Sequence, residues 1–283
     1  MSIPESFQFS QASLQDFVDC RRRFQLRYLL RRAWPAVEAE PVLENERTMR
    51  EGELFHRMVQ QHLLGIPAER LAEMAQSEDL GRWWENYRAH AGALPGFSEN
   101  ADPKPRRYPE VSLSATLDGF TLAAKCDLVV VTPDGRGVII DWKTAGRLPK
   151  RSNLSSRLQT RLYPYILAQA GAHLNQNRPF QPEQVEMVYW FAEFPTRPER
   201  FPYSASQLQA DETYLRGLIA EIQRLGEADF LLTEKVELCR FCVYRSLCNR
   251  GVQAGELEES GQQVEGESPG FDFDFEQIAE IEF

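Results

Sequence analysis

The chain has 283 residues, 42% of them hydrophobic, so it is long enough to bury one good core. Its net charge of -10 is unevenly placed, because ten of the 42 acids and none of the 32 bases lie in residues 251–283. No apolar run approaches 18 residues, no signal peptide opens the chain and no internal repeat is visible. These features exclude a membrane helix and a solenoid and favour a cytoplasmic protein.

The first third of the chain is predicted to be helical. Residues 13–30 open with a Ser-x-x-Asp cap and carry an apolar stripe that includes Leu14, Phe17 and Phe24. Residues 47–64 show the same helical spacing of apolar positions, and residues 68–91 form a third expected helix. A Pro-rich connector follows.

Strands dominate the middle of the chain. Asp118-Gly119 is a hairpin signal, and the turn sequence 132–136 separates two β-branched apolar runs, so three successive strands should pair as hairpins. The expected elements are strands at 110–117, 121–131, 137–143 and 184–192 and helices at 155–170 and 206–225. This order predicts a three-layer α/β/α sandwich with a mostly antiparallel sheet and a helical N-terminal region.

Two carboxylates and an amine are expected to converge in these hairpins. Pairing of the apolar runs brings Asp127 opposite Asp141 within about one residue of register. Because side chains alternate along a strand, Asp141 and Lys143 share a face while Trp142 points away. Carboxylates from two strands can hold Mg²⁺ or Mn²⁺, and a lysine beside the ion can orient a water molecule.

Further polar residues extend this pattern on both sides. His56 lies one helical turn after Gly52, and a neutral imidazole can serve as an additional metal ligand. Gln159 and Tyr163 are four residues apart on an expected helix and therefore share one face.

This series resembles the PD-(D/E)XK nucleases of the RecB-like branch from about residue 9 to residue 250. The residues that carry the resemblance are, in chain order, Gly52, His56, Glu110, Asp127, Asp141, Lys143, Gln159 and Tyr163. The resemblance implies a restriction-endonuclease-like core in which His56, Glu110, Asp127 and Asp141 bind metal. It also implies that Lys143 serves the attacking water and that Gln159 and Tyr163 contact the substrate strand. Cys126 departs from the small or basic residue expected before the motif aspartate.

Five cysteines form a second pattern. Cys239, Cys242 and Cys248 have the spacing Cys-x2-Cys-x5-Cys, which lets one short loop wrap a metal. The fourth ligand is either Cys20 or Cys126, and we choose Cys20 because Cys126 adjoins the carboxylate pair. Spacing alone does not separate zinc from an iron-sulfur cluster, since both take four thiolates. In the RecB-like branch a subgroup binds a [4Fe-4S] cluster with one cysteine before the core and three after it, and this resemblance favours iron-sulfur.

The sequence therefore predicts a Mg²⁺- or Mn²⁺-dependent deoxyribonuclease over residues 1–250 with a structural [4Fe-4S] cluster. We expect an exonuclease acting on single-stranded or frayed DNA in recombination repair or CRISPR spacer acquisition, with a helicase or CRISPR integration proteins as partners and no membrane. One alternative is a catalytically silent DNA-binding subunit of a helicase-nuclease complex. Another is a zinc-stapled interaction module whose carboxylates are only structural.

Charge localisation supplies the last expectations. Residues 1–250 hold 32 acids and 32 bases. The bases gather in two groups that could follow a phosphate backbone: Arg21, Arg22, Arg23, Arg27, Arg31 and Arg32, and then Arg147, Lys150, Arg151, Arg157 and Arg161. The acidic residues 251–283 are expected to form a disordered tail.

Overall fold

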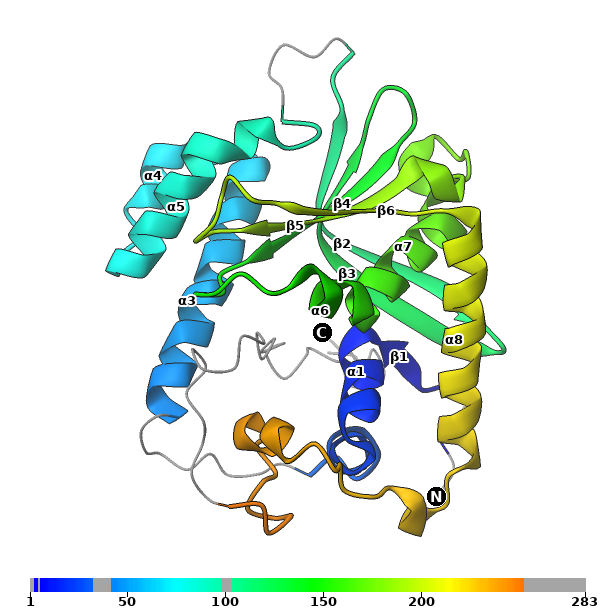
Figure 1. The fold of residues 1–283 in the computed structure, drawn as a ribbon. Coiled ribbons are helices and arrows are strands. Elements are labelled where there is room, and N and C mark those ends of the chain that lie inside the picture. Colours follow the sequence, from blue (N-terminus) through cyan, green and yellow to red (C-terminus); the bar gives the residue numbers. More distant parts are fainter. Residues whose placement is uncertain (1–2, 5, 33–41, 98–102, 252–283) are drawn as a thin grey trace, which may run out of the picture.

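The computed structural model describes residues 3–4, 6–32, 42–97 and 103–251. In this part of the chain a mixed six-stranded sheet carries helices on both faces (Figure 1). The predicted three-layer α/β/α sandwich, with a mostly antiparallel sheet and a helical N-terminal region, is confirmed.

The sheet is built around one long strand. Its strands are β1 (Gln8–Ser10), β2 (Arg106–Leu117), β3 (Phe120–Val131), β4 (Gly137–Lys143), β5 (Val185–Phe191) and β6 (Glu199–Pro202). The order is β1-β3-β4-β5-β6, and β2 also pairs with β3. The β1–β3 and β4–β5 pairs are parallel, whereas the other three pairs are antiparallel. Strand β3 thus pairs with β1 near its start and with β4 near its end.

Helices cover both faces of this sheet. The α-helices are α1 (Gln11–Asp19), α2 (Arg21–Phe24), α3 (Val42–Leu63), α4 (Ala68–Ala72), α5 (Glu78–His90), α6 (Arg151–Ser156), α7 (Leu158–Ala170) and α8 (Ala205–Arg224). The shorter segments are the π-helical η1 (Gln25–Leu29) and the 3-10 turns η2 (Ala91–Ala93), η3 (Gly171–Asn175), η4 (Pro182–Gln184), η5 (Glu227–Asp229) and η6 (Val236–Phe241).

Two hydrophobic clusters fill the spaces between the layers. On one face, side chains of α3, α4 and α5 such as Phe55 and Trp84 pack with Trp142 and Trp190. On the other face, α1, α7 and α8 pack against residues such as Val129. Every residue of β4 and β5 is buried, because helices cover these strands on both faces. Trp142 lies on the α3 face, as the alternation of the strand predicted.

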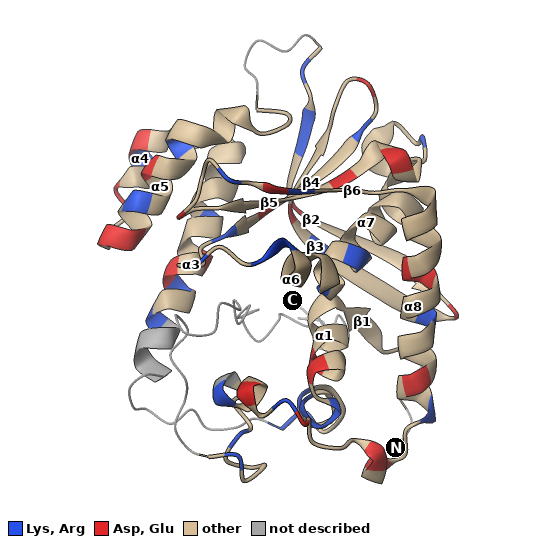
Figure 2. Cartoon of the chain, in the orientation of Figure 1, with Lys and Arg blue, Asp and Glu red and all other residues tan. Residues whose placement is uncertain are grey.

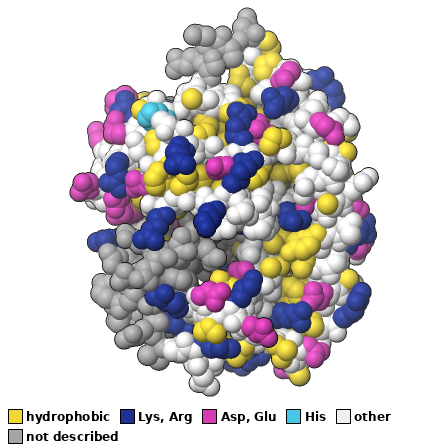
Figure 3. All heavy atoms as spheres, in the orientation of Figure 1, with side chains coloured by type: hydrophobic (Ala, Val, Ile, Leu, Met, Phe, Trp, Pro, Cys, Tyr) yellow, Lys and Arg dark blue, Asp and Glu magenta, His cyan; other side chains and the backbone are white. Residues whose placement is uncertain are grey.

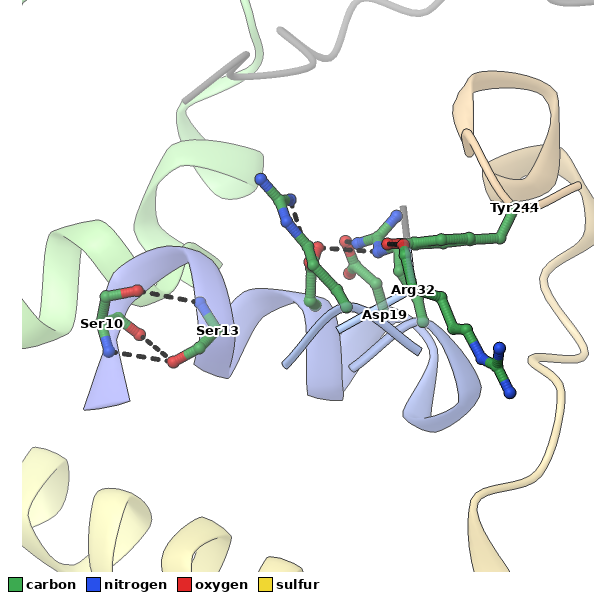
Figure 4. Close-up of polar contacts among 8 residues, drawn as sticks. Ser10, Ser13, Asp19, Arg32 and Tyr244 are labelled. Carbon is green, nitrogen blue, oxygen red and sulfur yellow. Dashed lines mark hydrogen bonds and ion pairs between the residues drawn. The ribbon is translucent and has the colours of Figure 1, made fainter. Parts of the chain in front are cut away.

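The first predicted helix is interrupted, which corrects the expectation of one helix over residues 13–30. Cys20 has an extended backbone (φ -161°, ψ 107°) and separates α1 from α2. The helix also begins earlier than predicted. Ser10, not Ser13, is the N-cap: Ser13 N donates to Ser10 Oγ at 3.1 Å and Ser10 N donates to Ser13 Oγ at 2.9 Å (Figure 4).

Two other predicted helices are also divided. Residues 68–91 give α4 and α5, because Ser77 caps a new helix by accepting a hydrogen bond from Leu80 N at 3.2 Å. Residues 155–170 give the end of α6 and all of α7, separated by the extended Arg157. The short strands β1 and β6 were not predicted from the sequence.

The pleat of β3 changes phase in its second half. Leu122 and Ala124 belong to the cluster on the α7 face, whereas Leu128 and Val130 belong to the cluster on the α3 face. Regular alternation would keep all four on one face. Opposite this change, Glu110 of β2 has a left-handed backbone, with φ of 51°. The change of phase occurs at Asp127, one of the acidic residues of the polar site described below.

Candidate metal centre and the residues around it

Asp127 and Asp141 lie where two strands part. The β3–β4 ladder ends at the pair Leu128 and Ile140, so both carboxylates come one residue beyond it. Asp127 Oδ2 accepts a hydrogen bond from Trp142 N at 2.8 Å, which satisfies a backbone donor that the ladder leaves. The predicted register of Asp127 and Asp141 is therefore observed.

Three potential ligands meet at Asp127. The ligand atoms of His56, Glu110 and Asp127 all lie within 4.8 Å of one another, and theirs is the one such group among the residues that the structure describes. His56 Nδ1 is 3.4 Å from Asp127 Oδ1. Helix α3 and strands β2 and β3 each contribute one residue. Two carboxylates and an imidazole are a donor set that suits Mg²⁺ or Mn²⁺, so the residues fit a divalent cation.

Asp141 is held by two buried partners. Lys143 Nζ lies 2.9 Å from Asp141 Oδ2, and Gln159 Nε2 donates to Asp141 Oδ1 at 2.6 Å. All three residues are at least 95% buried. Removing two charges from water is costly, so a buried pair of this kind marks a candidate functional site.

Charge interactions link the pKa values of the residues in this site. Burial opposes the charged form of His56, but the adjacent Asp127 carboxylate outweighs this effect and raises the pKa of His56. Burial likewise disfavours the Asp127 carboxylate, yet His56 and Lys143 hold its pKa below the usual value. The pKa of Cys126 is raised by burial first and then by the neighbouring carboxylates. Cys126 is a fully buried core residue, so its departure from the motif affects packing.

Helix α7 presents the two remaining motif residues. Gln159 reaches Asp141, whereas Tyr163, one turn further on, is buried in the cluster on the α7 face. Pro164 lies inside the helix and does not end it. The structure thus brings Gln159 into the polar site and places Tyr163 in the hydrophobic cluster on the α7 face.

Some contacts of the site were not foreseen from the sequence. Lys143 Nζ lies 5.7 Å from the centre of the Tyr189 ring, and Tyr189 is the β5 partner of Asp141. The Tyr189 hydroxyl is 2.7 Å from Thr160 Oγ1 on α7. An alternating strand pattern marks Tyr189 only as buried, so pairing of β4 with β5 was needed to find it.

Gly52 lets α3 approach the strand that carries Lys143. A Cβ at this position would lie 3.1 Å from Thr144 Oγ1, tighter than ordinary contact. A residue without a side chain is therefore suited to this close approach.

Four of the five cysteines influence one another. The pKa values of Cys239, Cys242 and Cys248 are raised by burial first, and the thiol of Cys20 raises each of them further, that of Cys242 to about 11. Cys126 instead interacts with the acids of the polar site. Cys20, which lies at the break between α1 and α2, is thus near enough to the three C-terminal cysteines to raise their pKa values.

Direct contacts join these two distant segments. Tyr244 Oη donates to the carbonyl of Arg32 at 2.9 Å (Figure 4), and Arg22 N donates to the carbonyl of Leu231 at 3.2 Å. The rings of Phe24 and Phe230 are stacked with centroids 6.3 Å apart. The N-terminal helices are thus attached to the last described segment of the chain.

The first basic group is partly neutralised. Arg21 pairs with Glu221, and Arg23 and Arg27 both pair with Asp16. Lys and Arg residues are interspersed with Asp and Glu along the ribbon (Figure 2), and their side chains are interspersed over the face drawn in Figure 3.

In the second basic group, Arg151 and Arg161 have carboxylate partners. Arg147 and Lys150 are exposed in the segment directly after Lys143 and form no ion pair with a described residue. They are the better candidates for contact with a phosphate backbone.

The chain is similar to known proteins over almost all of its described residues. The model of the PD-(D/E)XK nuclease superfamily matches residues 8–249. A crystal structure from Eubacterium rectale described as "Putative exonuclease" has a similar fold, with a TM-score of 0.50 and 11% identity over 89% of this chain and 92% of that one. The crystal structure of SSO0001 gives a TM-score of 0.40 and 13% identity over 89% and 90%. No curated protein matches the chain.

Proposed function

Because the chain belongs to the PD-(D/E)XK nuclease superfamily, we propose that it is a metal-dependent deoxyribonuclease whose centre is built from His56, Glu110, Asp127, Asp141 and Lys143. The convergence of the metal-ligand group with the buried Asp141–Lys143 pair carries this proposal. These residues come from α3, β2, β3 and β4, and a purely structural ion pair would not need all of them.

A divalent cation held by His56, Glu110, Asp127 and Asp141 would acidify a water molecule and stabilise negative charge on the phosphate. The residues of the chain position the other participants. Gln159 holds Asp141 by a hydrogen bond to Oδ1, leaving Oδ2 facing Lys143. Lys143, packed over Tyr189, can orient the attacking water and take up or release its proton.

The path of the substrate is proposed to follow the segment after β4. Arg147 and Lys150 lie a few residues beyond Lys143, where phosphates on either side of the scissile bond would pass. Gln159 and Tyr163 are proposed to contact the same strand. The fold neighbour from Eubacterium rectale described as an exonuclease supports extending that activity to this chain, acting on single-stranded or frayed DNA. Recombination repair or CRISPR spacer acquisition would supply such ends.

A four-cysteine cluster is proposed to attach the N-terminal helices to the nuclease core. Four thiolates around one zinc ion at about 2.3 Å would lie roughly 3.8 Å apart. Within the described chain, no three of the sulfur atoms of Cys20, Cys239, Cys242 and Cys248 lie within 4.8 Å of one another. A [4Fe-4S] cluster binds each thiolate to a different iron and accepts a wider spacing, so we favour it over zinc.

The proposal is tested by nuclease assays on the purified full chain with Mg²⁺ or Mn²⁺. Lys143→Ala is expected to lower the rate about 10²- to 10⁴-fold, and Asp141→Ala to abolish activity, while DNA binding persists. Lys235→Ala, an exposed lysine in another region, is the matched control. Degradation of linear DNA but not of closed circles would identify an exonuclease.

Two outcomes would oppose the proposal. A wild-type rate in Asp141→Ala would exclude this centre as the source of activity. DNA binding by the wild-type chain without any metal-dependent degradation would favour the catalytically silent subunit.

A further inference from the structure

Helix α7 carries Gln159, and a side chain of another helix binds its first backbone N–H. The N-cap residue of α7, Arg157, is extended and has no side-chain oxygen with which to cap the helix. Leu158 N instead donates a hydrogen bond to Gln15 Oε1 of α1 at 3.2 Å. The first N–H groups of a helix have no partner within the helix, so Gln15 satisfies one of them from 143 residues earlier in the chain.

The amide of Gln15 is held at both of its ends. Its Nε2 donates to Asp19 Oδ1 at 3.0 Å, one turn further along α1. Asp19 Oδ2 in turn accepts a hydrogen bond from Arg23 at 2.9 Å. A primary amide donates only through its nitrogen and accepts only through its oxygen. The carboxylate that binds Nε2 therefore leaves Oε1 to accept from the start of α7.

The residue after Leu158 belongs to the proposed metal centre. Gln159 Nε2 donates to Asp141 Oδ1 at 2.6 Å, and both residues are buried. The other carboxylate oxygen, Asp141 Oδ2, lies 2.9 Å from Lys143 Nζ. One backbone step therefore joins the hydrogen bond of Gln15 to the hydrogen bond that holds Asp141.

A second anchor lies on the other side of Gln159. The hydroxyl of Thr160 is 2.7 Å from the Tyr189 hydroxyl on β5. The first turn of α7 is thus attached to α1 through Leu158 and to the sheet through Thr160. Gln159 lies between these two attachments, so the loss of either one would let its side chain shift relative to the carboxylate that it binds.

From these contacts we propose that Gln15 is a positioning residue of the metal centre. It holds the first turn of α7 and thereby keeps Gln159 directed at Asp141, so that the carboxylate is already oriented for a divalent cation. Residues that orient a metal ligand affect metal affinity without touching the metal. The inference rests on the proposed function, in which Asp141 is a metal ligand.

Calorimetric titration of the full chain with Mn²⁺ tests this role without requiring nuclease activity. Only the binding that Asp127→Ala removes is assigned to the centre. Gln15→Leu loses both polar contacts and should weaken this binding about fivefold. Gln15→Glu keeps an oxygen that accepts from Leu158 N, and a carboxylate is favourable at a helix N-terminus, so Mn²⁺ binding should stay within about twofold of the wild type. Gln209→Leu, at an exposed glutamine on α8, is the matched control and should bind as the wild type does.

A double-mutant cycle separates positioning from a general effect on the fold. Gln159→Leu should itself weaken Mn²⁺ binding, and adding Gln15→Leu to that variant should weaken it no further, because Gln15 acts through Gln159. Hydrogen exchange followed by mass spectrometry in metal-free buffer gives an independent measurement. Exchange at residues 158–161 should be faster in Gln15→Leu than in the wild type and unchanged in Gln15→Glu.

The possible failures are distinguishable. Wild-type Mn²⁺ affinity in Gln15→Leu, or losses that add fully in the double variant, would overturn the positioning role and leave the metal centre in place. Equal losses of affinity in Gln15→Glu and Gln15→Leu would overturn it as well, because the acceptor oxygen would then be irrelevant. No Mn²⁺ binding by the wild-type chain would overturn the metal centre and this inference with it.

Discussion

Glu110 combines an unfavourable backbone with a favourable position for its carboxylate. A left-handed conformation costs a residue with a Cβ on the order of 1 kcal/mol, and here it lies within a strand. The strain coincides with the change of phase in β3 and brings the carboxylate within reach of Asp127 and His56. Such strain is typical of functional sites, where surrounding structure enforces it.

Glu110→Gln is therefore expected to weaken metal binding more than it weakens the fold. Loss of one carboxylate should raise the Mn²⁺ concentration needed for half-maximal activity by at least about tenfold, with little change in Tm. Glu85→Gln removes an exposed carboxylate on α5 and serves as the control. An unchanged Mn²⁺ requirement in Glu110→Gln would remove Glu110 from the ligand set.

His62 offers a pH-dependent contribution to stability outside the metal centre. Its Nδ1 lies 3.0 Å from the Tyr87 hydroxyl, and burial, followed by Arg107 and Arg88, lowers its pKa. A depressed pKa means that the folded chain favours the neutral ring. The stability that this provides is present above the unfolded pKa of about 6.5 and is lost as pH falls through the folded value.

Replacing His62 by Gln should make the Tm less sensitive to acid. We expect the fall in Tm between pH 7.5 and pH 5.5 to be smaller for His62→Gln than for the wild-type chain, measured by circular dichroism in matched buffers. His173→Gln, an exposed histidine on η3, should keep the wild-type dependence. Parallel curves for His62→Gln and the wild type would contradict the assignment.

The residue at the interruption between α1 and α2 is Cys20, one of the four proposed cluster ligands. The extended backbone of Cys20 ends α1, and the Cys20 thiol raises the pKa of Cys239. The four proposed ligands thus come from segments more than 200 residues apart. A cluster at this junction would stabilise the folded chain by closing a long loop.

Cys20→Ser is expected to lose iron and thermal stability together, whereas Cys126→Ser should retain iron. A structural metal contributes on the order of 10 kcal/mol of apparent binding free energy, and about 1 kcal/mol shifts Tm by 2–4 °C in a chain of this size, so Tm should fall by roughly 20–40 °C. Iron analysis, visible absorption and thermal melts of anaerobically purified protein measure both effects. Iron retained in Cys20→Ser and lost in Cys126→Ser would show that the fourth ligand was wrongly chosen. Zinc in place of iron would favour the zinc-stapled module.

At the scale of the whole molecule, charge is divided between a neutral body and an acidic C-terminal segment. Most of the segment, residues 252–283, lies outside the described residues, so the expectation of a disordered tail stays a prediction from sequence. No helix in the described part of the chain is long and apolar enough to cross a membrane. The segment joins the body directly after the cysteine region, which gives it a high effective concentration near the basic groups.

Deleting residues 251–283 is expected to tighten DNA binding, most at low salt. The ten acids of this segment can compete with phosphates for the basic groups. Phe and Asp alternate over residues 271–275, which sets aromatic rings beside carboxylates. Fluorescence anisotropy at about 50 mM and 200 mM salt measures the difference between the two chains. Equal affinities at low salt would leave the segment only a solubilising or docking role.

Local sequence patterns were enough to predict the features that depend on near neighbours. The alternation of side chains along a strand predicted that Trp142 lies on the other face of the strand from Asp141 and Lys143. The turn residues predicted the hairpins on either side of Asp127. Residues 137–143 were predicted with the bounds that the strand has. These patterns repeat every two to four residues, so the local sequence contains them completely.

Local patterns did not predict which distant segments of the chain lie in contact. Three features join residues far apart in the chain. They are the parallel pairing of β1 with β3, the contact of Lys143 with Tyr189 and the hydrogen bond of Leu158 N with Gln15. The break at Cys20 could not be predicted either, because the apolar stripe of the sequence continues through it. Such features depend on which surfaces bury each other when the layers pack, and no local periodicity specifies that choice.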